Sequence, residues 1–365
     1  MFGEVCSNHT HSFLWGNETI LFDHELECTV SKTVFILFSF IGIAGLVGNA
    51  LVVLVVAANP MMRSTTNILI INLAIADLLF VIFCVPFTGF DYVLASWPFG
   101  TVWCSFVQYM IVVTCHASVY TLVLMSLDRF LAVVHPISSI SIRTQRNALL
   151  AIIVTWLIVT TTAFPVFISH GEVEYHNHRN EINTACLFLT DDGNIAIFQI
   201  SFFLSSYVIP LTLISILYIG MLIRLWHSAP GSKVSAESRR GKKRVTRMVV
   251  FVVLAFAVCW LPIHIVLVLK SLQMYETSRL GVSIQIFSHV LAYTNSFINP
   301  ILYNCFSENF RKAFRKSGAE SQFLWELQVL KSRKPEQQEQ LQPHKMGEFH
   351  PPPNSSKITE EISTV

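Results

Sequence analysis

The 365-residue chain is too apolar for an ordinary water-soluble protein, since 53% of its residues are hydrophobic, 13% are charged and the mean hydropathy is +0.54. Soluble domains usually carry about 25% charged residues. The formal net charge of +2 says little by itself, because acidic and basic residues lie in different parts of the chain. This composition excludes a typical cytosolic enzyme and indicates a membrane protein.

Seven apolar segments follow one another along the chain, and each is long enough to cross a bilayer as a helix. They are residues 33–59, 67–90, 101–127, 147–169, 193–223, 248–269 and 280–307. Strands of a membrane barrel would be about 10 residues long and would alternate in polarity, whereas these segments do not. The sequence therefore predicts an all-α bundle of seven membrane-spanning helices over residues 33–306, after an N-terminal segment of residues 1–32.

The basic residues predict how the chain is oriented in the membrane. Seven spans place the two termini on opposite sides of the membrane. Of the 25 Lys and Arg residues, 21 then lie on the same side of the membrane as the C-terminus. The other four lie on the side of the N-terminus: Lys32, Arg179, Lys270 and Arg279. Cytoplasmic loops carry the excess of positive charge, so we expect an extracellular N-terminus and a cytoplasmic C-terminus in the plasma membrane. Asn8 and Asn17 begin two glycosylation triplets, which lie in the predicted extracellular segment.

Four cysteines fall on the predicted extracellular side, where disulfides persist: Cys6, Cys28, Cys104 and Cys186. Cys104 lies at the outer end of the third span and Cys186 in the loop after the fourth, so a bridge between them would hold that loop over the bundle. Whether Cys6 and Cys28 form a second pair is left open.

The C-terminal part is predicted to leave the membrane. Over residues 307–317, Phe310 and Phe314 are four residues apart among basic residues, which predicts an amphipathic helix on the inner leaflet. Residues 318–365 are polar and are predicted to be a disordered tail. The last three residues, Ser-Thr-Val, match peptides that PDZ domains bind at their terminal carboxylate.

One carboxylate, Asp77, lies inside a predicted span, and such a residue is by default a candidate for function because it is costly in hydrocarbon. Its candidate partners on other spans are Asn49, Ser118, Asn295, Ser296 and Asn299. The alternative is a polar cluster that only holds helices together.

In the sixth span, Phe256, Trp260 and His264 recur every four residues around Pro262, a pattern that predicts a proline hinge beside a packed aromatic stripe. An Asp-Arg-Phe triplet at residues 128–130 places an ion pair at the cytoplasmic end of the third span. A snorkelling arginine is the simpler interpretation of that pair.

Together, these motifs resemble the rhodopsin-type (class A) family of G-protein-coupled receptors, with at least one motif in each span and in the family's order. The resemblance covers about residues 33–316. The matching residues are Gly48-Asn49, Leu73-Ala74, Asp77, Cys104, Asp128-Arg129-Phe130, Trp156, Cys186, Pro210, Tyr218, Cys259-Trp260-Leu261-Pro262 and Asn299-Pro300-Ile301-Leu302-Tyr303.

The resemblance implies roles for particular residues. It implies a disulfide between Cys104 and Cys186. It implies that activation and G-protein coupling depend on Asp128, Arg129, Phe130, Tyr218, Phe256, Pro262, Asn299, Pro300 and Tyr303. It also implies a sodium pocket formed by Asp77, Ser118, Asn295 and Ser296. Many members hold the arginine with an acid at the inner end of the sixth span, but here that stretch is basic, which argues against such a lock.

Two absences narrow the class of receptor. Amine receptors of this family carry an Asp in the third span where this chain has Ile111 and Val112, and opsins carry a Lys in the seventh span near Tyr293. The chain therefore resembles neither. Several longer runs resemble the galanin and allatostatin-A receptor group instead, with the latter favoured: residues 67–73, 97–100, 118–124, 125–136, 169–172 and 309–315.

The predicted extracellular surface carries 12 acidic residues against four basic ones, which favours a cationic or neutral amidated peptide over an anionic one. The candidate ligand-binding residues are Asp91, Gln108, Ile111, Val112, Cys115, Phe188, Trp260, His264, Leu267 and His289. The resemblance implies a ligand ending in Tyr-x-Phe-Gly-Leu-amide. A galanin-like or other neuropeptide is the alternative.

The partners that we expect are an amidated neuropeptide, a heterotrimeric G protein of the inhibitory type, arrestin, membrane lipid and a PDZ-domain protein, with no nucleic acid and no cofactor besides a sodium ion. A membrane enzyme is a second class, with His116, His264 and His289 as metal ligands, but no His-Glu-x-x-His run or neighbouring carboxylate completes a catalytic site. A transporter is a third class, but the two halves show no repeat.

Overall fold

The computed structural model describes residues 13–15, 18–20, 24–59, 62, 64–94, 96–176, 181–227, 236–276, 278–306 and 310–312, with the backbone alone at 13–15, 18–20, 24–30, 225–227 and 236–245. All of them belong to one structural unit, Met1–Phe314. The glycosylation sites at Asn8 and Asn17, the pairing of Cys6 with Cys28, most of the amphipathic helix and the tail from residue 313 onward lie outside the side chains described.

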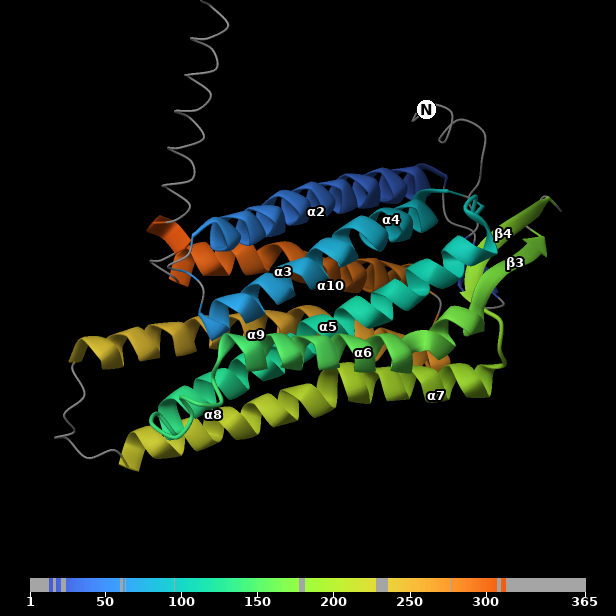
Figure 1. Cartoon of the computed structure of the whole chain (residues 1–365). Helices are drawn as coiled ribbons and strands as arrows, with labels where there is room; N and C mark the ends of the chain where they lie inside the picture. The colour runs from blue at the N-terminus through green and yellow to red at the C-terminus, as the bar shows by residue number, and fades with distance from the viewer. Residues whose placement is uncertain are drawn as a thin grey trace, which may run out of the picture. The chain divides into compact units, whose positions relative to one another are not determined.

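Helices dominate the described residues and run side by side (Figure 1). They are α2 (His24–Ala58), α3 (Thr65–Phe83), α4 (Val85–Val93), α5 (Gly100–Val134), α6 (Gln145–Ser169), α7 (Asp192–Phe203), the π-helical segment η2 (Leu204–Val208), α8 (Ile209–His227), α9 (Ala236–Ser271) and α10 (Arg279–Phe306). The pairs α3–α4 and α7–α8 each continue in one direction, so each of the seven predicted spans is helical. The prediction of an all-α seven-helix bundle is confirmed.

Six of these spans are long and apolar enough to cross a membrane: Ser31–Ala58, Thr65–Val93, Gly100–Val134, Gln145–Ser169, Asp192–Arg224 and Thr246–Ser271. The seventh predicted span, α10, has 28 residues but is not among the six. Polar residues such as Gln285, Asn295 and Asn299 interrupt its apolar sequence, and they are buried in the bundle rather than exposed.

The bundle exposes a large apolar surface, and its interior holds polar side chains beside a hydrophobic core. Ile43 and Val102 are 67% and 75% exposed on the outer surface, whereas Asn49 and Asp77 are 0% and 1% exposed in the interior. Hydrocarbon solvates an apolar surface as readily as a protein core does, while interior polar groups find partners on other helices. This distribution is the one expected of a protein surrounded by lipid.

Local sequence signals set several helix ends. The Ser64 side chain accepts a hydrogen bond of 3.2 Å from the Asn67 backbone N–H at the start of α3, and Thr144 caps α6 through Asn147 at the same distance. The second span changes helix at Cys84, one residue before α4, whose first turn contains a proline.

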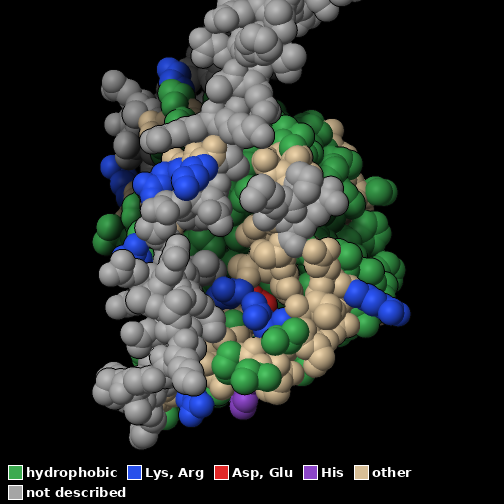
Figure 2. Space-filling model, turned by 60° about the vertical axis from the view of Figure 1, so that its left-hand side comes forward, with side chains coloured by type: hydrophobic (Ala, Val, Ile, Leu, Met, Phe, Trp, Pro, Cys, Tyr) green, Lys and Arg blue, Asp and Glu red, His purple; other side chains and the backbone are tan. Residues whose placement is uncertain are grey.

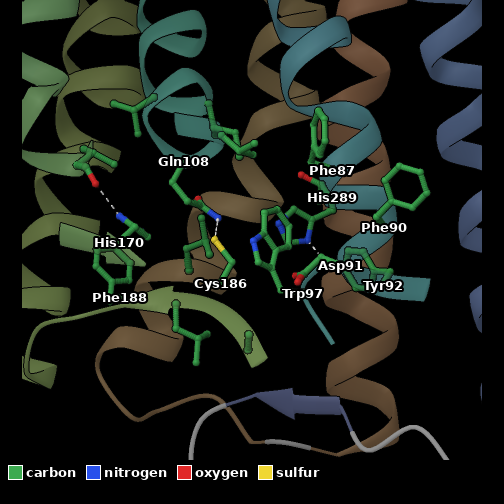
Figure 3. A pocket seen from close by; sticks show the side chains of 18 of the residues that line it. Phe87, Phe90, Asp91, Tyr92, Trp97, Gln108, His170, Cys186, Phe188 and His289 are labelled. Atoms are coloured by element: carbon green, nitrogen blue, oxygen red, sulfur yellow. Dashed lines mark hydrogen bonds between the residues drawn. The ribbon is translucent and has the colours of Figure 1, made fainter. Parts of the chain in front are cut away.

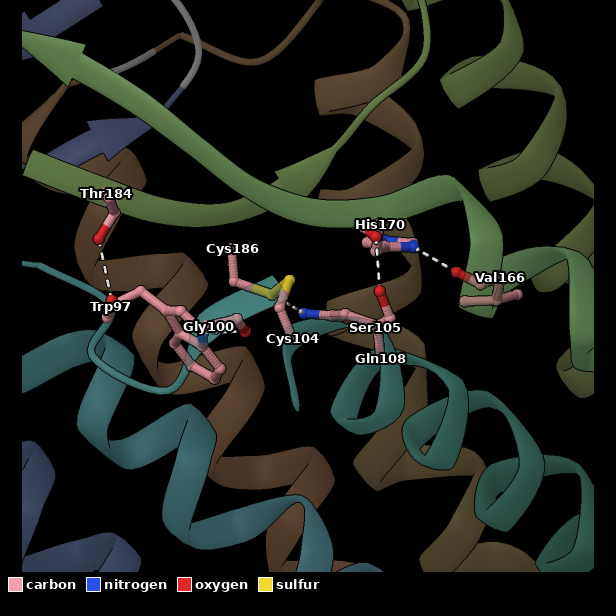
Figure 4. The surroundings of a disulfide bond; sticks show 9 residues. All are labelled: Trp97, Gly100, Cys104, Ser105, Gln108, Val166, His170, Thr184 and Cys186. Atoms are coloured by element: carbon pink, nitrogen blue, oxygen red, sulfur yellow. Dashed lines mark hydrogen bonds between the residues drawn. A yellow bond between two sulfur atoms is a disulfide. The ribbon is translucent and has the colours of Figure 1, made fainter. Parts of the chain in front are cut away.

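An antiparallel hairpin covers one end of the bundle, which we call the hairpin end. It consists of β3 (His170–His176) and β4 (Ile182–Phe188), with Glu172 opposite Cys186. The predicted disulfide between Cys104 and Cys186 is present and ties β4 to α5 (Figure 4). A second, shorter hairpin joins β1 (Phe13–Trp15) to β2 (Glu18–Ile20).

Hydrogen bonds on both sides of the disulfide fix the β3–β4 hairpin further. The Trp97 backbone N–H donates to the Thr184 carbonyl (2.8 Å), and the Thr184 hydroxyl donates to the Trp97 carbonyl (2.9 Å). On the other side, the Ser105 hydroxyl donates to the His170 carbonyl (2.7 Å), as Figure 4 shows. The predicted loop is therefore a fixed cover over the helices.

Candidate ligand pocket and signalling core

A cavity of about 310 Å³ lies below the β3–β4 hairpin, between α4, α5, α7, α9 and α10 (Figure 3). Eight of the ten predicted ligand-binding residues line it: Asp91, Gln108, Ile111, Val112, Phe188, Trp260, Leu267 and His289. Ligand pockets usually fall between about 300 and 1,000 Å³ and combine apolar walls with a few polar groups. The size and lining of this cavity match that description.

The polar groups of the cavity lie on opposite walls (Figure 3). On the α4 side, the Tyr92 hydroxyl lies 2.6 Å from Nδ1 of His289 in α10, and the Asp91 carboxylate lies beside them. On the far side, the rings of His170 and Phe188 are tilted by 43° to each other, with centroids 3.8 Å apart. Within the described residues, Asp91 makes no hydrogen bond or ion pair, so its carboxylate is available to a ligand.

Burial controls the charge of His170, which lies just beyond α6 under the hairpin. The side chain is removed from water, and this burial lowers the pKa of His170 from its usual 6.5 to about 4, although a hydrogen bond of 2.9 Å to the Val166 carbonyl acts in the opposite direction. His170 is therefore neutral at physiological pH and donates Nδ1–H to that carbonyl.

The other two predicted ligand-binding residues, Cys115 and His264, do not line the cavity. Both are about 1% exposed. Nε2 of His264 lies 3.3 Å from the Ser206 hydroxyl of η2. The ring is enclosed by Phe202, Phe203 and Tyr207, with centroids 5.0 to 5.6 Å away. A ligand in this cavity is therefore separated from His264 by neighbouring aromatic rings. Direct contact between a ligand and His264 stays a prediction.

Several cavity residues were not predicted from the sequence. Tyr92, Phe198, Gln285 and Tyr293 also line the cavity, and the Tyr293 hydroxyl lies 2.8 Å from that of Thr88. A sequence signal for two of them was present, because Gln285 and Tyr293 lie four residues before and after His289 on one helix face. The sequence contained no comparable signal for Phe198.

Trp260 forms the floor of the cavity and connects it to the interior. Its ring lies about 6 Å from the rings of Phe80, Phe256 and His264, so it contacts three neighbours at once. Pro262 lies inside α9 two residues further on, where it removes a backbone hydrogen bond. Trp260 therefore links the cavity lining to the part of α9 that contains Pro262.

A polar cluster surrounds Asp77 deeper in the bundle. Nδ2 of Asn299 donates to Oδ2 of Asp77 (2.8 Å), and the Ser118 hydroxyl lies 3.4 Å from Oδ1. Asn49 donates to the Ser296 carbonyl (2.6 Å). The buried Oδ1 atoms of Asn49, Asn295 and Asn299 accept no hydrogen bond from the residues that the structure describes. A carboxylate among unpaired amide oxygens is a donor set that suits a small hard cation.

Close helix contacts surround this cluster. A Cβ atom at Gly48 would lie 3.0 Å from Cγ of Pro300, so the glycine lets α2 approach α10. Tyr303 is fully buried and stacks on Phe310, with ring centroids 5.5 Å apart. Phe130 lies against Gly220 of α8 in a similar close contact. The predicted activation residues Phe130 and Tyr303 therefore lie in tightly packed positions.

At the end of the bundle opposite the hairpin, which we call the Arg129 end, one carboxylate holds two arginines. Oδ2 of Asp128 accepts hydrogen bonds from the Thr66 hydroxyl (2.8 Å) and from Nε of Arg129 (3.0 Å), while Oδ1 accepts one from Nε of Arg143 (2.8 Å). Arg129 also donates to the Thr66 hydroxyl. Figure 2 shows a small acidic patch (red) beside basic side chains (blue) on one face of the molecule. The Arg143 contact was not predicted.

Comparison with known proteins identifies the family. The sequence profile described as "7 transmembrane receptor (rhodopsin family)" matches residues 48–303, which include the Asp77 cluster, the cavity and Asp128–Arg129. The chain belongs to this family. It is thus a multi-pass plasma-membrane receptor, and coupling to a heterotrimeric G protein is general in the family.

Individual relatives place the receptor among the neuropeptide receptors. It is 64% identical over 321 residues to the allatostatin-A receptor of Bombyx mori, covering 86% of this chain and 89% of that protein. It is 36% identical over 281 residues to the human galanin receptor type 2, covering 77% and 71%. A galanin-like G-protein coupled receptor of Caenorhabditis elegans is 36% identical over 328 residues, covering 82% and 75%.

Proposed function

We propose that the receptor binds an amidated neuropeptide of the allatostatin-A type at the hairpin end and responds by catalysing nucleotide exchange on a G protein at the Arg129 end. The 64% identity to an allatostatin-A receptor over most of both chains is the observation that carries the choice of ligand. The cavity between the hairpin and Trp260 supports it, because its size and its lining of apolar walls with a few polar groups suit the end of a peptide.

The hairpin end is the extracellular one in this proposal. The Cys104–Cys186 bridge needs an oxidising compartment to persist, and the cytosol is reducing. Most Lys and Arg residues belong to the other side of the membrane by sequence, as the positive-inside rule requires. A peptide would therefore enter from outside and the G protein would dock inside.

The chemistry of the cavity favours an uncharged peptide terminus. The rings of Phe87, Phe90 and Trp260 provide apolar walls, and the Asp91 carboxylate contributes negative charge. A terminal carboxylate would lose its hydration there and meet a like charge, whereas an amide pays only for hydrogen bonds that Gln108 and His289 can replace. The Asp91 carboxylate would in turn attract a basic group of the same peptide.

The experiment measures GDP–GTP exchange on purified G protein with the receptor in lipid nanodiscs. An amidated peptide ending in Tyr-x-Phe-Gly-Leu-amide is compared with its free acid, with galanin and with an amidated peptide of scrambled sequence. Desolvating a carboxylate costs several kcal/mol, so we expect the amide to be at least about 100-fold more potent than the acid. Equal potency of the amide and the acid would contradict this assignment of the pocket. Higher potency of galanin would mean that the ligand is of the galanin type instead.

The intracellular partners form a separate part of the proposal. We propose coupling to the inhibitory class of G protein, binding of arrestin, and capture of the Ser-Thr-Val terminus by a PDZ domain. The resemblance to galanin-type receptors supports the first two and the terminal residues support the third. Exchange assays with G proteins of different classes test the coupling. Adding one residue after Val365 should abolish PDZ binding, and unchanged binding would contradict that assignment.

A sodium ion is the proposed allosteric ligand of the Asp77 cluster. The carboxylate, the Ser118 hydroxyl and the unpaired amide oxygens of Asn295 and Asn299 would hold it. The ion would compensate a buried charge and would stabilise whichever receptor state binds it better.

A further inference from the structure

At the Arg129 end, the buried carboxylate of Asp128 is shared between two arginines that use different oxygen atoms. Arg129 binds Oδ2, and Arg143 binds Oδ1 at 2.8 Å. The side chains of Asp128 and Arg129 are 5% and 10% exposed, while that of Arg143 is 25% exposed. Because the two arginines occupy separate oxygens, one can leave without disturbing the geometry of the other.

The turn that carries Arg143 is held by contacts that do not involve Arg129. Arg143 ends a tight turn between α5 and α6, in which its backbone N–H donates to the Ser139 carbonyl (2.8 Å). Ser139 in turn donates its hydroxyl to the Leu131 carbonyl of α5 (3.1 Å). The Thr65 hydroxyl of α3 lies 3.3 Å from the Arg143 carbonyl. These contacts hold the turn against α3 and α5 on their own.

Arg129 must give up its present partners before it can contact another protein. It is 8% exposed, and the hydrogen bonds described for its guanidinium go to Asp128 and Thr66. Breaking a buried ion pair from one side is expensive, because the remaining charge is left without compensation. If Arg129 were the sole cation paired with Asp128, its departure would leave the Asp128 carboxylate without a compensating charge.

We propose that Arg143 is a positioning residue for signalling: it stays on Oδ1 of Asp128 when Arg129 leaves Oδ2, and so reduces the free-energy cost of releasing Arg129 toward the G protein. In the resting receptor, Arg143 is a second cation on a carboxylate that Arg129 already neutralises. In the signalling receptor, it is the remaining cation. Its contribution is therefore larger in the signalling state, and only such a difference shifts the equilibrium between two states.

This inference rests on G-protein coupling at the Arg129 end, and it is independent of the identity of the peptide. It is tested by basal nucleotide exchange without peptide, for the wild type, Arg143→Gln, Arg143→Lys and the matched control Arg146→Gln. Arg146 lies three residues further along the chain, is exposed, and makes no ion pair within the described residues. All rates are normalised to monodisperse receptor, so a variant that fails to fold is not counted.

We expect Arg143→Gln to lower basal exchange about tenfold, within the range of about 5- to 150-fold that is typical of coupling between sites. Arg143→Lys should keep most of the activity, because it keeps the charge, and Arg146→Gln should resemble the wild type. A rise in basal exchange in Arg143→Gln would overturn the proposal, since it would make Arg143 part of a resting-state lock.

A double-mutant cycle separates this role from direct binding of the G protein. In an Asp128→Asn background no buried charge remains to be compensated, so adding Arg143→Gln should leave the exchange rate unchanged within about twofold. The same tenfold loss in that background would overturn the proposal, because Arg143 would then act without Asp128. If Asp128→Asn does not fold, the comparison of Gln and Lys at position 143 with the Arg146 control still decides whether Arg143 raises or lowers basal exchange. Absence of exchange in every receptor, the wild type included, would instead contradict G-protein coupling.

Discussion

The Tyr92 hydroxyl and Nδ1 of His289 lie 2.6 Å apart and join α4 to α10 across one wall of the cavity. Tyr92 is 3% exposed, so its hydroxyl has little access to water as an alternative partner. The contact thus connects two helices that are almost 200 residues apart in sequence, and it also orients a polar group that faces the ligand.

Removing this contact should weaken peptide binding. Tyr92→Phe leaves a partly buried imidazole without its partner, which costs about 1–3 kcal/mol, and we expect about a tenfold loss of affinity in a competition assay. Tyr109→Phe is the matched control, because it removes a hydroxyl that donates to the Thr160 carbonyl away from the cavity lining. A similar loss in both variants would mean that the Tyr92 contact has no special part in binding.

The approach of α2 to α10 predicts a stability effect at Gly48. A Cβ there would lie 3.0 Å from Cγ and 3.2 Å from Cβ of Pro300, whose ring is too rigid to move aside. Gly48→Ala should therefore destabilise the receptor by about 1–3 kcal/mol, seen as a lower melting temperature in detergent. Gly193→Ala, which has open space around it, should melt like the wild type. Equal melting of both variants would contradict the close approach.

The Asp77 cluster predicts a dependence on sodium. If the ion stabilises the resting receptor, the affinity for an amidated agonist should fall as sodium replaces choline at constant ionic strength. Asp77→Asn should remove this dependence, because the amide brings no negative charge to the ion. A variant that keeps the wild-type response to sodium would place the ion elsewhere.

The buried His170 predicts that stability falls in mild acid. Its pKa is lowered to about 4 in the folded receptor, so between pH 6.5 and pH 4 the unfolded chain binds a proton that the folded one does not. The stabilising contribution is complete above pH 6.5 and is lost progressively below it, by about 1.4 kcal/mol for each pH unit. Melting temperatures from pH 7.5 to 5 should fall less steeply in His170→Gln than in the wild type. Parallel curves would show that His170 titrates normally.

The sequence predicted the spans well because a bilayer demands long apolar runs, and helix is the conformation that satisfies the backbone within them. It did not predict how far helices continue outside the membrane: α5 extends to Val134 and α9 begins at Ala236, where hydropathy no longer reports on the fold. The β3–β4 hairpin was also missed, since its register depends on the disulfide and on Trp97 rather than on an alternating pattern.

Within the site, helical spacing predicted which residues share a helix face, but not how far around the helix the lining of the cavity extends. Trp260 and His264 are four residues apart, and each such step turns about 40° around the helix. Trp260 consequently lines the cavity, while His264 lies behind its wall against η2. The pairing of Arg143 with Asp128 was also missed, because a turn brings them together and no periodicity marks a turn.

The central claim is that a peptide at the hairpin end acts on a G protein through Arg129 at the other end. The most direct measurement compares peptide affinity and peptide-stimulated nucleotide exchange in Arg129→Ala, in one nanodisc preparation with purified G protein. The account predicts that affinity stays within about threefold of the wild type, because Arg129 is remote from the cavity, and that stimulated exchange is abolished. Normal exchange by Arg129→Ala would contradict the account.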